Sequence, residues 1–403
     1  MQGSEQVKIR DIFDKCREFT RATEVKQSGY YPYFNPISSA AANTVKINGK
    51  ELIMIGSNNY LGLTTHPKVI EASREAIKKY GVGCTGSRFL NGTLDIHVEL
   101  EEKLAEFLKK EAVLVFSTGF QTNLGTISCL VNKNDLILAD RSDHASIVDG
   151  CRLAFGKTLK YKHNDMDDLE RILVSRNNGD QGIMVVTDGV FSMEGDVVDL
   201  PKLVQLRERF GFRILVDDAH SLGVLGEYGA GTASHFGLSD QIDLTMGTFS
   251  KSFASIGGVI AAEEYVINYI KHFSRPMIFS AALPPSAVAT VLECLKIMKA
   301  EPERREKLIQ NGRKMRDGFR AMGYCIGTTE TPIVPVYIGE DMACFKFWRA
   351  LYDAGIFANA IIAPAVTPGN ALIRTSYTAT HTDEQLDFVL ETFEKVGKKL
   401  DLI

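Results

Sequence analysis

"ILVDDAHSLG", residues 214–223, is the stretch that decides the fold class. It begins as a short apolar run, ends that run in Asp217, and places His220 shortly afterwards. Short apolar runs of this kind are typical of strands buried on both faces of a parallel sheet, and ligands bind beyond the carboxyl ends of such strands. A buried carboxylate is costly unless a cation pairs with it. A metal ion or a capped helix would also explain Asp217, so the segment alone leaves its role open.

The same pattern recurs along the chain. Further apolar runs occupy residues 112–117, 135–140, 182–189, 243–248 and 257–262. They alternate with helix-like stretches such as 67–80 and 96–109, which predicts an α/β fold whose mostly parallel sheet is covered by helices on both faces. Polar residues follow the runs at the edge where a ligand would bind: Thr118, Gly119, Asp140, Asp188 and Thr248.

The character of the sequence divides the chain into three regions. Residues 1–60 predict an N-terminal helix and short strands, and residues 61–290 predict a large domain built on the sheet. After Pro284 and Pro285 the pattern changes, and residues 291–403 predict a smaller α+β domain.

Composition argues against several classes of protein. With 403 residues and a net charge of −4, the chain is an ordinary globular sequence that implies no nucleic-acid partner. The N-terminus is too polar for a signal peptide, and no apolar run of about 18 residues predicts a membrane span. The seven cysteines have no CxxC spacing, so neither a zinc site nor a disulfide framework is expected, and a reducing cytoplasm fits best.

A lysine among small hydroxyl residues is the second informative feature. Lys251 lies in "TFSKSFASIGG", residues 248–258, where Thr248 and Ser250 supply short hydrogen-bond donors that suit a phosphate. A lysine beside a phosphate site suggests a Schiff base with a phosphorylated aldehyde cofactor. Taken alone, the segment is equally compatible with a solvated lysine on a surface loop.

Three further segments suit the same ligand. Thr118, Gly119 and Phe120 lie between a strand and a helix, where backbone N–H groups bind phosphate. His144, in "RSDHAS", begins a helix and either stacks on a flat ring or caps that helix. Ser192, in "TDGVFSMEGD", follows another strand and could equally belong to a surface loop.

The order of these features along the chain is informative. A phosphate cradle, a ring-stacking histidine, an aspartate for a protonated ring nitrogen and a lysine follow one another in the sequence. This is the pattern of a pyridoxal-phosphate enzyme with the aspartate-aminotransferase fold, and it calls for no metal.

Motifs along nearly the whole chain resemble those of the α-oxoamine synthase family of pyridoxal-phosphate-dependent acyl-CoA transferases. They span about residues 30–382 and include "GSNNYLGL", "GCTGSRFLNGT", "VDDAHSLGVLG", "GTFSKSFASIGG" and "IRTSYTATHT". The resemblance implies fold type I of these enzymes, with a mostly parallel seven-stranded sheet in the large domain and a smaller C-terminal α+β domain.

The resemblance also assigns roles to residues. Lys251 would form the Schiff base and serve as general base, Asp217 would pair with the pyridine nitrogen, and His220 would bond the phenolic oxygen. His144 would stack on the ring and take part in catalysis. The contacts expected for the cofactor are Thr118, Gly119, Phe120, His144, Ser192, Asp217, His220, Thr248, Ser250, Lys251, Ser280 and Ala281.

Two further implications concern the substrate and the partner. Asn59 and Arg374 would bind the substrate carboxylate. The family pattern implies a homodimer whose active sites lie at the interface, where Ser280 or Ala281 would reach the phosphate held by the other subunit.

The local matches "SMEGDVVDLP" and "SRPMIFSAALPPS" are closest to the bacterial members that condense L-serine with palmitoyl-CoA. That reaction releases CoA and CO2 and yields 3-ketodihydrosphingosine, the first step of sphingolipid synthesis. The alternatives are a 2-amino-3-ketobutyrate CoA ligase, which uses glycine and acetyl-CoA, and a non-catalytic subunit of a lipid pathway. Lys251 argues against the last. A cytoplasmic enzyme with peripheral contact to the inner membrane is expected.

Overall fold

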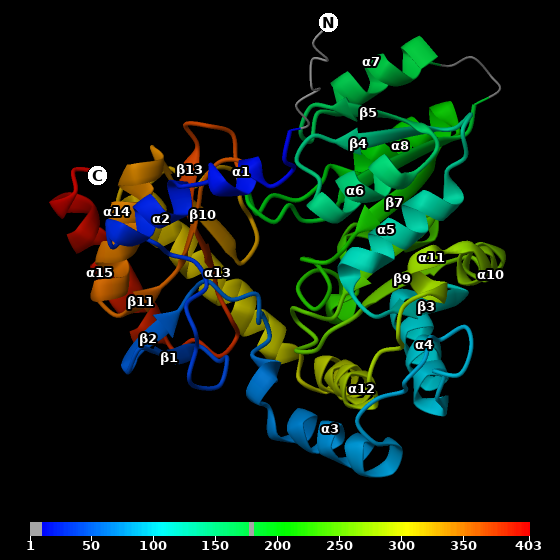
Figure 1. Ribbon diagram of the computed structural model, residues 1–403, viewed down its shortest axis with the longest axis horizontal. Coiled ribbons are helices and arrows are strands. Elements are labelled where there is room, and N and C mark those ends of the chain that lie inside the picture. Colours follow the sequence, from blue (N-terminus) through cyan, green and yellow to red (C-terminus); the bar gives the residue numbers. More distant parts are fainter. Residues whose placement is uncertain (1–9, 177–180) are drawn as a thin grey trace, which may run out of the picture.

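A seven-stranded sheet forms the centre of the large domain, which lies on the right of Figure 1. The structure is a computed structural model that describes residues 10–176 and 181–403. The strand order is β3-β9-β8-β7-β6-β4-β5. From β5 to β8 the neighbours are parallel, whereas β9 is antiparallel to both β3 and β8. The fold class predicted from the sequence is therefore confirmed. The strands are β3 (Ala112–Phe116), β4 (Leu136–Asp140), β5 (Lys157–Tyr161), β6 (Ile183–Asp188), β7 (Arg213–Asp217), β8 (Leu244–Thr248) and β9 (Gly258–Ala262).

Strand β5 is the one member of this sheet that the apolar runs did not reveal. It lies at the edge of the sheet, where β4 is its one partner among the described strands, and its sequence, KTLKY, carries two lysines. Of its five residues, only Tyr161 is fully buried. An edge strand is covered less completely than a central strand, so it needs no continuous apolar run.

The alternation of side chains along β7 explains why helices cover both faces of the sheet. Ile214 and Val216 point into an apolar core formed with α7 (Met166–Arg176) and α8 (Leu200–Phe210). Leu215 points into the core formed with α5 (Gly119–Leu130) and α6 (Ala145–Leu153). All three side chains are fully buried. A strand buried on both faces reads as an unbroken apolar run, which is what the sequence shows.

The helices of the large domain connect or cover these strands. A third core unites α3, α4 and α12 with β3 and β9. Their bounds are α3 (Pro67–Tyr80), α4 (Asp95–Leu108), α5 (Gly119–Leu130), α6 (Ala145–Leu153), α7 (Met166–Arg176), α8 (Leu200–Phe210), α9 (Thr232–His235), α10 (Glu264–Phe273), α11 (Arg275–Ile278) and α12 (Pro285–Ala300), with short 3-10 helices η1 (Leu63–Thr65), η2 (Glu227–Gly229) and η3 (Ser239–Gln241).

The carboxyl ends of the central strands meet at one edge of the sheet. Asp188, the last residue of β6, pairs in register with Asp217, the last residue of β7. The first turn of α5 approaches the same edge, because Gly119 packs against Gly258 at the start of β9. A Cβ atom on Gly258 would lie 2.6 Å from the Cα atom of Gly119. The absence of a side chain at Gly258 thus lets the N-terminus of α5 come close to the sheet.

The smaller domain, on the left of Figure 1, combines segments from both halves of the chain. Strand β2 pairs with β1 and, in parallel, with β11, while β10, β13 and β12 form a second sheet. Both sheets contribute to one apolar core around Trp348. The elements are β1 (Thr44–Ile47), β2 (Lys50–Met54), β10 (Ile333–Gly339), β11 (Ile356–Phe357), β12 (Asn359–Ile361), β13 (Ala371–Ser376), α13 (Pro302–Ala321), α14 (Asp341–Asp353) and α15 (Asp383–Lys399).

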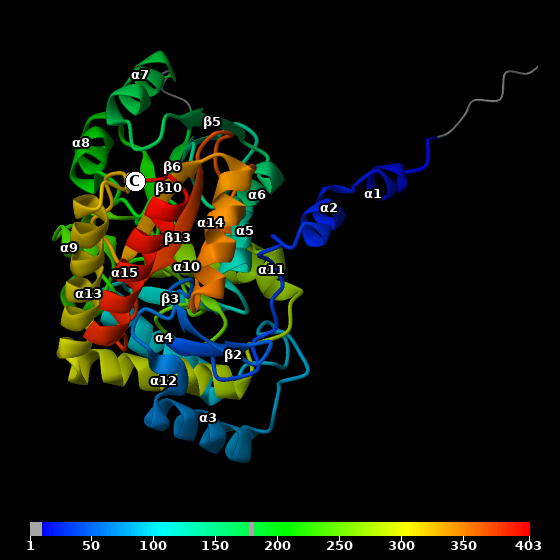
Figure 2. The ribbon, with the colours of Figure 1, turned by 90° about the vertical axis from the view of Figure 1, so that its left-hand side faces the viewer.

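The N-terminal helix is split in two: the first part extends away from the rest of the molecule (Figure 2), whereas the second contacts the smaller domain, where Arg21 pairs with Asp341 at 2.6 Å. Helices α1 (Asp14–Arg17) and α2 (Arg21–Gln27) bury no side chain, and Phe13 and Phe19 remain more than half exposed. Across the described residues, no helix combines the length and the apolar character needed to cross a membrane.

Candidate active site

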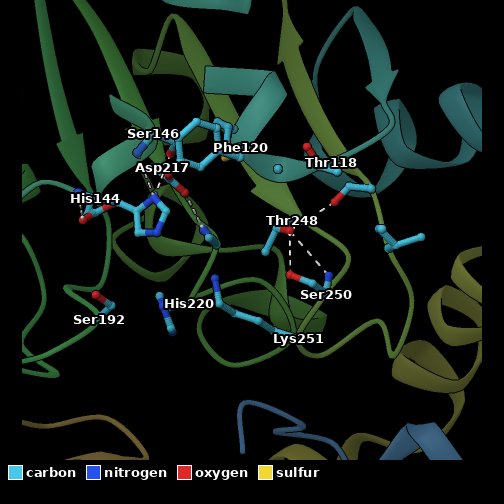
Figure 3. A pocket seen from close by; sticks show the side chains of 16 residues that line it. Thr118, Phe120, His144, Ser146, Ser192, Asp217, His220, Thr248, Ser250 and Lys251 are labelled. Atoms are coloured by element: carbon cyan, nitrogen blue, oxygen red, sulfur yellow. Dashed lines mark hydrogen bonds between the residues drawn. The ribbon is translucent and has the colours of Figure 1, made fainter. Parts of the chain in front are cut away.

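A cavity of about 340 Å³ opens at the carboxyl edge of the sheet, beside β6, β7, β8 and the first turn of α5 (Figure 3). Its walls come from segments that lie far apart in the sequence and that the fold brings together. The predicted cofactor residues that line it are Thr118, Gly119, Phe120, His144, Ser192, Asp217, His220, Thr248, Ser250 and Lys251.

Asp217 presents a buried carboxylate to this cavity. The side chain is 2% exposed, and its two oxygens accept hydrogen bonds from the amide of Asn123 at 2.6 Å and from the backbone N–H of Ala219 at 2.9 Å. Neutral donors alone leave a buried negative charge without a counterion, which is costly. The carboxylate therefore suits a ligand that carries a positive charge, such as a protonated ring nitrogen.

Lys251 projects into the cavity from the loop after β8 (Figure 3). Burial lowers the pKa of Lys251 to about 8, although the neighbouring carboxylates of Asp217 and Asp188 act in the opposite direction. The neutral amine is the form that attacks an aldehyde, so the lower pKa makes Lys251 a nucleophile near neutral pH. Burial, together with the charge of Asp217, raises the pKa of Asp188 well above its ordinary range.

His144 both caps a helix and lines the cavity, so the two roles considered for it are compatible. It is the N-cap residue of α6, where its Nδ1 atom lies 2.8 Å from Ser146 Oγ and accepts from the backbone N–H of Ser146 at 3.2 Å. Its own backbone N–H donates to Asp188 at 3.0 Å. Burial lowers the pKa of His144; Asp217 opposes this shift and Lys251 adds to it. The lowered pKa favours the neutral imidazole at neutral pH.

His220 is held by a tyrosine that the sequence did not single out. Its Nδ1 atom lies 2.7 Å from the hydroxyl of Tyr60, which is itself fully buried. Burial lowers the pKa of His220 well below its ordinary range and raises the pKa of Tyr60 to about 12. Both groups are thus neutral, and the hydrogen bond between them fixes the orientation of the imidazole at the cavity wall.

The first turn of α5 forms an anion site together with the end of β8. Thr118 is the N-cap residue, and its hydroxyl accepts from the backbone N–H of Gln121 at 3.1 Å. This cap leaves the N–H groups of Gly119 and Phe120 available at the positive end of the helix. Thr248 lies beside them and bonds Ser250 through their hydroxyls at 3.0 Å. Backbone donors with neighbouring hydroxyls suit a phosphate group.

Arg374 supplies a guanidinium close to this wall, although the cavity lining does not include it. The side chain is 4% exposed; Nε donates to the carbonyl of Ser192 at 2.6 Å and Nη2 to the side chain of Asn58 at 3.0 Å. The amide of Asn59 is used elsewhere, because it bonds Thr64 at 2.8 Å and accepts from the backbone N–H of Leu63 at 3.1 Å. The asparagine beside Arg374 is therefore Asn58, and the sequence had favoured its neighbour.

Ser280 and Ala281, which were expected to contact the cofactor, do not line this cavity. Instead, Ser280 accepts from the side chain of Gln121 at 3.1 Å, and the carbonyl of Ala281 accepts from the hydroxyl of Ser117. These contacts hold the segment against α5 and the residues that precede it. Neighbouring Phe279 is 75% exposed, so this part of the segment faces outward.

Two polar residues of the site were missed because no sequence signal separates them from structural residues. Asn123 lies in the second turn of α5 and Ser146 in the first turn of α6, where a polar side chain reads as an ordinary helix residue. Their role becomes visible only when α5 and α6 pack together under the cavity.

The chain belongs to the aminotransferase class I and II family, which matches residues 50–393. It is 50% identical over 391 residues to a serine palmitoyltransferase of Sphingobacterium spiritivorum, covering 97% of this chain and 98% of the relative. An 8-amino-7-oxononanoate synthase of Thermoanaerobacter pseudethanolicus is 45% identical, with 94% of this chain and 96% of the relative covered. A solved serine palmitoyltransferase of S. paucimobilis superposes with a TM-score of 0.94 at 36% identity, covering 98% of this chain and 100% of that chain.

Within that family, these relatives place the chain among the α-oxoamine synthases, as an acyltransferase similar to serine palmitoyltransferases. The solved relative has pyridoxal phosphate bound together with myriocin. The residues of this chain fit that cofactor: Asp217 suits a cationic ring nitrogen, the turn at Gly119 suits a phosphate, and Lys251 suits an aldehyde. Family and site agree on pyridoxal phosphate, which confirms the cofactor predicted from the sequence.

The lowered pKa of Lys251 predicts how the free energy of unfolding of the cofactor-free protein depends on pH. A folded-state pKa of about 8, against the ordinary value of 10.5, means that the unfolded chain binds more protons between these values. The contribution of Lys251 to the stability of the wild type should therefore become more favourable as pH rises across this window, by about 3 kcal/mol in total. Lys251→Met removes the buried amine, so the cofactor-free variant should have the higher Tm at pH 7, and the difference should shrink toward pH 10.

The measurement is thermal unfolding of both proteins, freed of cofactor, from pH 7 to pH 10. Lys296→Met is the matched control, because the side chain of Lys296 is 72% exposed and should change Tm little at any pH. A Tm difference between wild type and Lys251→Met that stays constant over the whole range would contradict the buried, easily deprotonated amine.

Proposed function

We propose that the protein condenses L-serine with a long-chain acyl-CoA, palmitoyl-CoA in particular, to give 3-ketodihydrosphingosine, CoA and CO2. The observation that carries this proposal is the 50% identity to a serine palmitoyltransferase over nearly the full length of both chains. The collected cavity residues support the same reaction, because each group that the chemistry needs faces the cavity or adjoins it.

The bond changes define what the side chains have to do. The Cα–H bond of serine breaks, Cα forms a bond to the acyl carbon, and the C–S bond of the thioester breaks to release CoA. The bond from Cα to the carboxylate then breaks to release CO2, and Cα takes up a proton. Pyridoxal phosphate, when bound, supplies the electron sink that makes each of these changes at Cα possible.

Side chains of the protein itself would bind the substrate and move the protons. Arg374 would hold the carboxylate of serine, which fixes the orientation of the bonds at Cα. Lys251, with a pKa of about 8, would take the Cα proton, since a base is most effective when its pKa is close to the working pH. His144, neutral and facing the cavity, would donate a hydrogen bond to the carbonyl oxygen of the incoming thioester.

A homodimer is part of the proposal. Beside α11, a surface hollow of about 520 Å³ is lined by exposed apolar side chains, among them Phe155, Phe273 and Phe279, which are 81%, 59% and 75% exposed. Clustered exposed aromatic residues mark an interaction surface. Ser280 lies in the same hollow, so pairing of two copies through this face would bring the segment with Ser280 and Ala281 toward the other subunit.

The cellular setting follows from the same reasoning. We infer a cytoplasmic enzyme, because all seven cysteines are free thiols, as expected in a reducing compartment. Peripheral contact with the inner membrane would give it access to long acyl chains.

Substrate choice is tested by kcat/KM. Serine with palmitoyl-CoA should give a higher kcat/KM than glycine with acetyl-CoA, because each methylene buried from water contributes about 0.8 kcal/mol to acyl-chain binding. Labelled serine and labelled glycine are each combined with acyl-CoA of increasing length, and Lys251→Ala serves as the inactive blank. A preference for glycine and acetyl-CoA would identify the ligase reaction instead, and absence of turnover with every pair would favour a non-catalytic subunit.

The dimer is tested by sedimentation. Phe279→Asp places a charge in the exposed apolar hollow and should weaken dimerisation by about 2 kcal/mol or more, which is roughly a 30-fold rise in Kd. Val174→Asp is the control, because Val174 is 62% exposed on α7, away from this face. If wild type sediments as a monomer while it is fully active, the proposed interface is wrong.

A further inference from the structure

Asn123 lies beneath the cavity and connects two of its walls. It belongs to α5, has no exposed surface, and does not itself line the cavity. Its Nδ2 atom lies 2.6 Å from Asp217 Oδ2 and 2.9 Å from Ser146 Oγ. One side chain amide thus contacts the carboxylate at the end of β7 and the first turn of α6.

The protons of this amide can be assigned from its partners. A carboxylate oxygen only accepts, so the group 2.6 Å from Asp217 must be the NH₂ end of Asn123 and not its carbonyl end. The NH₂ end has two protons, and the second points at Ser146 Oγ. The amide oxygen of Asn123 has no hydrogen-bond partner among the described residues. The position therefore uses Asn123 as a double donor.

The chain of bonds continues to His144. Because the hydroxyl of Ser146 accepts from Asn123, its own proton is free to be donated, and the nearest acceptor is Nδ1 of His144 at 2.8 Å. The backbone N–H of Ser146 also points at Nδ1, at 3.2 Å. Two donors aimed at one ring nitrogen require that nitrogen to be without a proton. The proton of the neutral imidazole then resides on Nε2.

Figure 3 shows the ring of His144 with Ser146 on one side and the interior of the cavity on the other. Nε2 makes no hydrogen bond within the part of the chain that the structure describes. An N–H group that has no protein partner and faces a cavity is a donor held ready for a ligand oxygen.

We propose that Asn123 is a positioning residue: through Ser146 it couples Asp217 to His144 and holds His144 as the tautomer that carries its proton on Nε2. The carboxylate that meets the ring nitrogen of the cofactor and the imidazole that meets the substrate are thereby oriented by the same amide. A helix cap alone would need Ser146 and not Asn123, since the cap consists of the bonds between His144 and Ser146.

The tautomer can be measured without cofactor or substrate. The protein is labelled with ¹⁵N in its eight histidines, and the two ring nitrogens of His144 are identified by the signals lost in His144→Gln. In the cofactor-free wild type, Nδ1 should show the shift of an unprotonated nitrogen and Nε2 that of a protonated one. A proton on Nδ1 of the wild type would overturn the proposal without reference to any variant.

Two variants test the coupling, and a third is the matched control. Asn123→Leu removes both donated protons at similar volume, and Ser146→Ala removes the relay hydroxyl. Either change should move the Nδ1 and Nε2 shifts of His144 toward a mixture of tautomers. Thr126→Val changes a residue of the same helix that is also fully buried but whose hydroxyl bonds to no described group, and it should leave both shifts unchanged.

Cofactor affinity gives an independent readout. Because Asn123→Leu also removes a donor from Asp217, the Kd of the cofactor-free variant for pyridoxal phosphate should rise about tenfold, while Thr126→Val should match wild type. Unchanged His144 shifts in both Asn123→Leu and Ser146→Ala would overturn the coupling, even if the variants are less stable. The inference rests on the proposed function only for the identity of the substrate oxygen that Nε2 of His144 would contact. Neither readout uses serine or acyl-CoA. If the proposed substrates are wrong, both results are therefore unaffected.

Discussion

The carboxylate of Asp217 is the constraint on which the rest of the active site depends. It is buried at the end of β7, between the neighbouring strands β6 and β8, and the sheet gives it no room to reach water. Hydrogen bonds from Asn123 and from the backbone of Ala219 hold its position but bring no positive charge. A buried carboxylate of this kind is tolerated where a cation completes it, and we propose that a protonated ring nitrogen of the cofactor is that cation.

The other charged groups of the cavity adjust to this carboxylate. Burial lowers the pKa of Lys251, and Asp217 limits the shift, so the amine remains able both to react with an aldehyde and to carry a proton. The same negative charge adds to burial in raising the pKa of Asp188. His144 and His220, in contrast, are kept neutral by burial. Burial, and not Asp217, thus keeps both imidazoles neutral, and at His144 the charge of Asp217 opposes that effect.

The sequence predicted those parts of the site that lie at strand ends. A buried strand leaves an unbroken apolar run, so the positions of Asp217 and Thr248 could be inferred from local pattern alone. Strand β5 was not predicted, because an edge strand keeps polar residues and leaves no unbroken apolar run. The predicted N-terminal helix is two short helices that bury no side chain. Contacts that depend on how helices pack could not be read locally. Asn123 reaches Asp217 only because α5 lies against the sheet, and the choice between Asn58 and Asn59 depends on which amide η1 uses for its own hydrogen bonds.

The pairing of Asp217 with the cofactor is tested most directly by the protonation state of the ring nitrogen in bound pyridoxal phosphate. Pyridoxal phosphate labelled with ¹⁵N in its ring is bound to wild type and to Asp217→Asn, and the ring nitrogen shift is recorded at neutral pH. We predict a protonated nitrogen in wild type and an unprotonated one in Asp217→Asn, because the amide cannot stabilise a positive charge as the carboxylate does. An unprotonated ring nitrogen in the wild type would contradict the pairing of Asp217 with the cofactor.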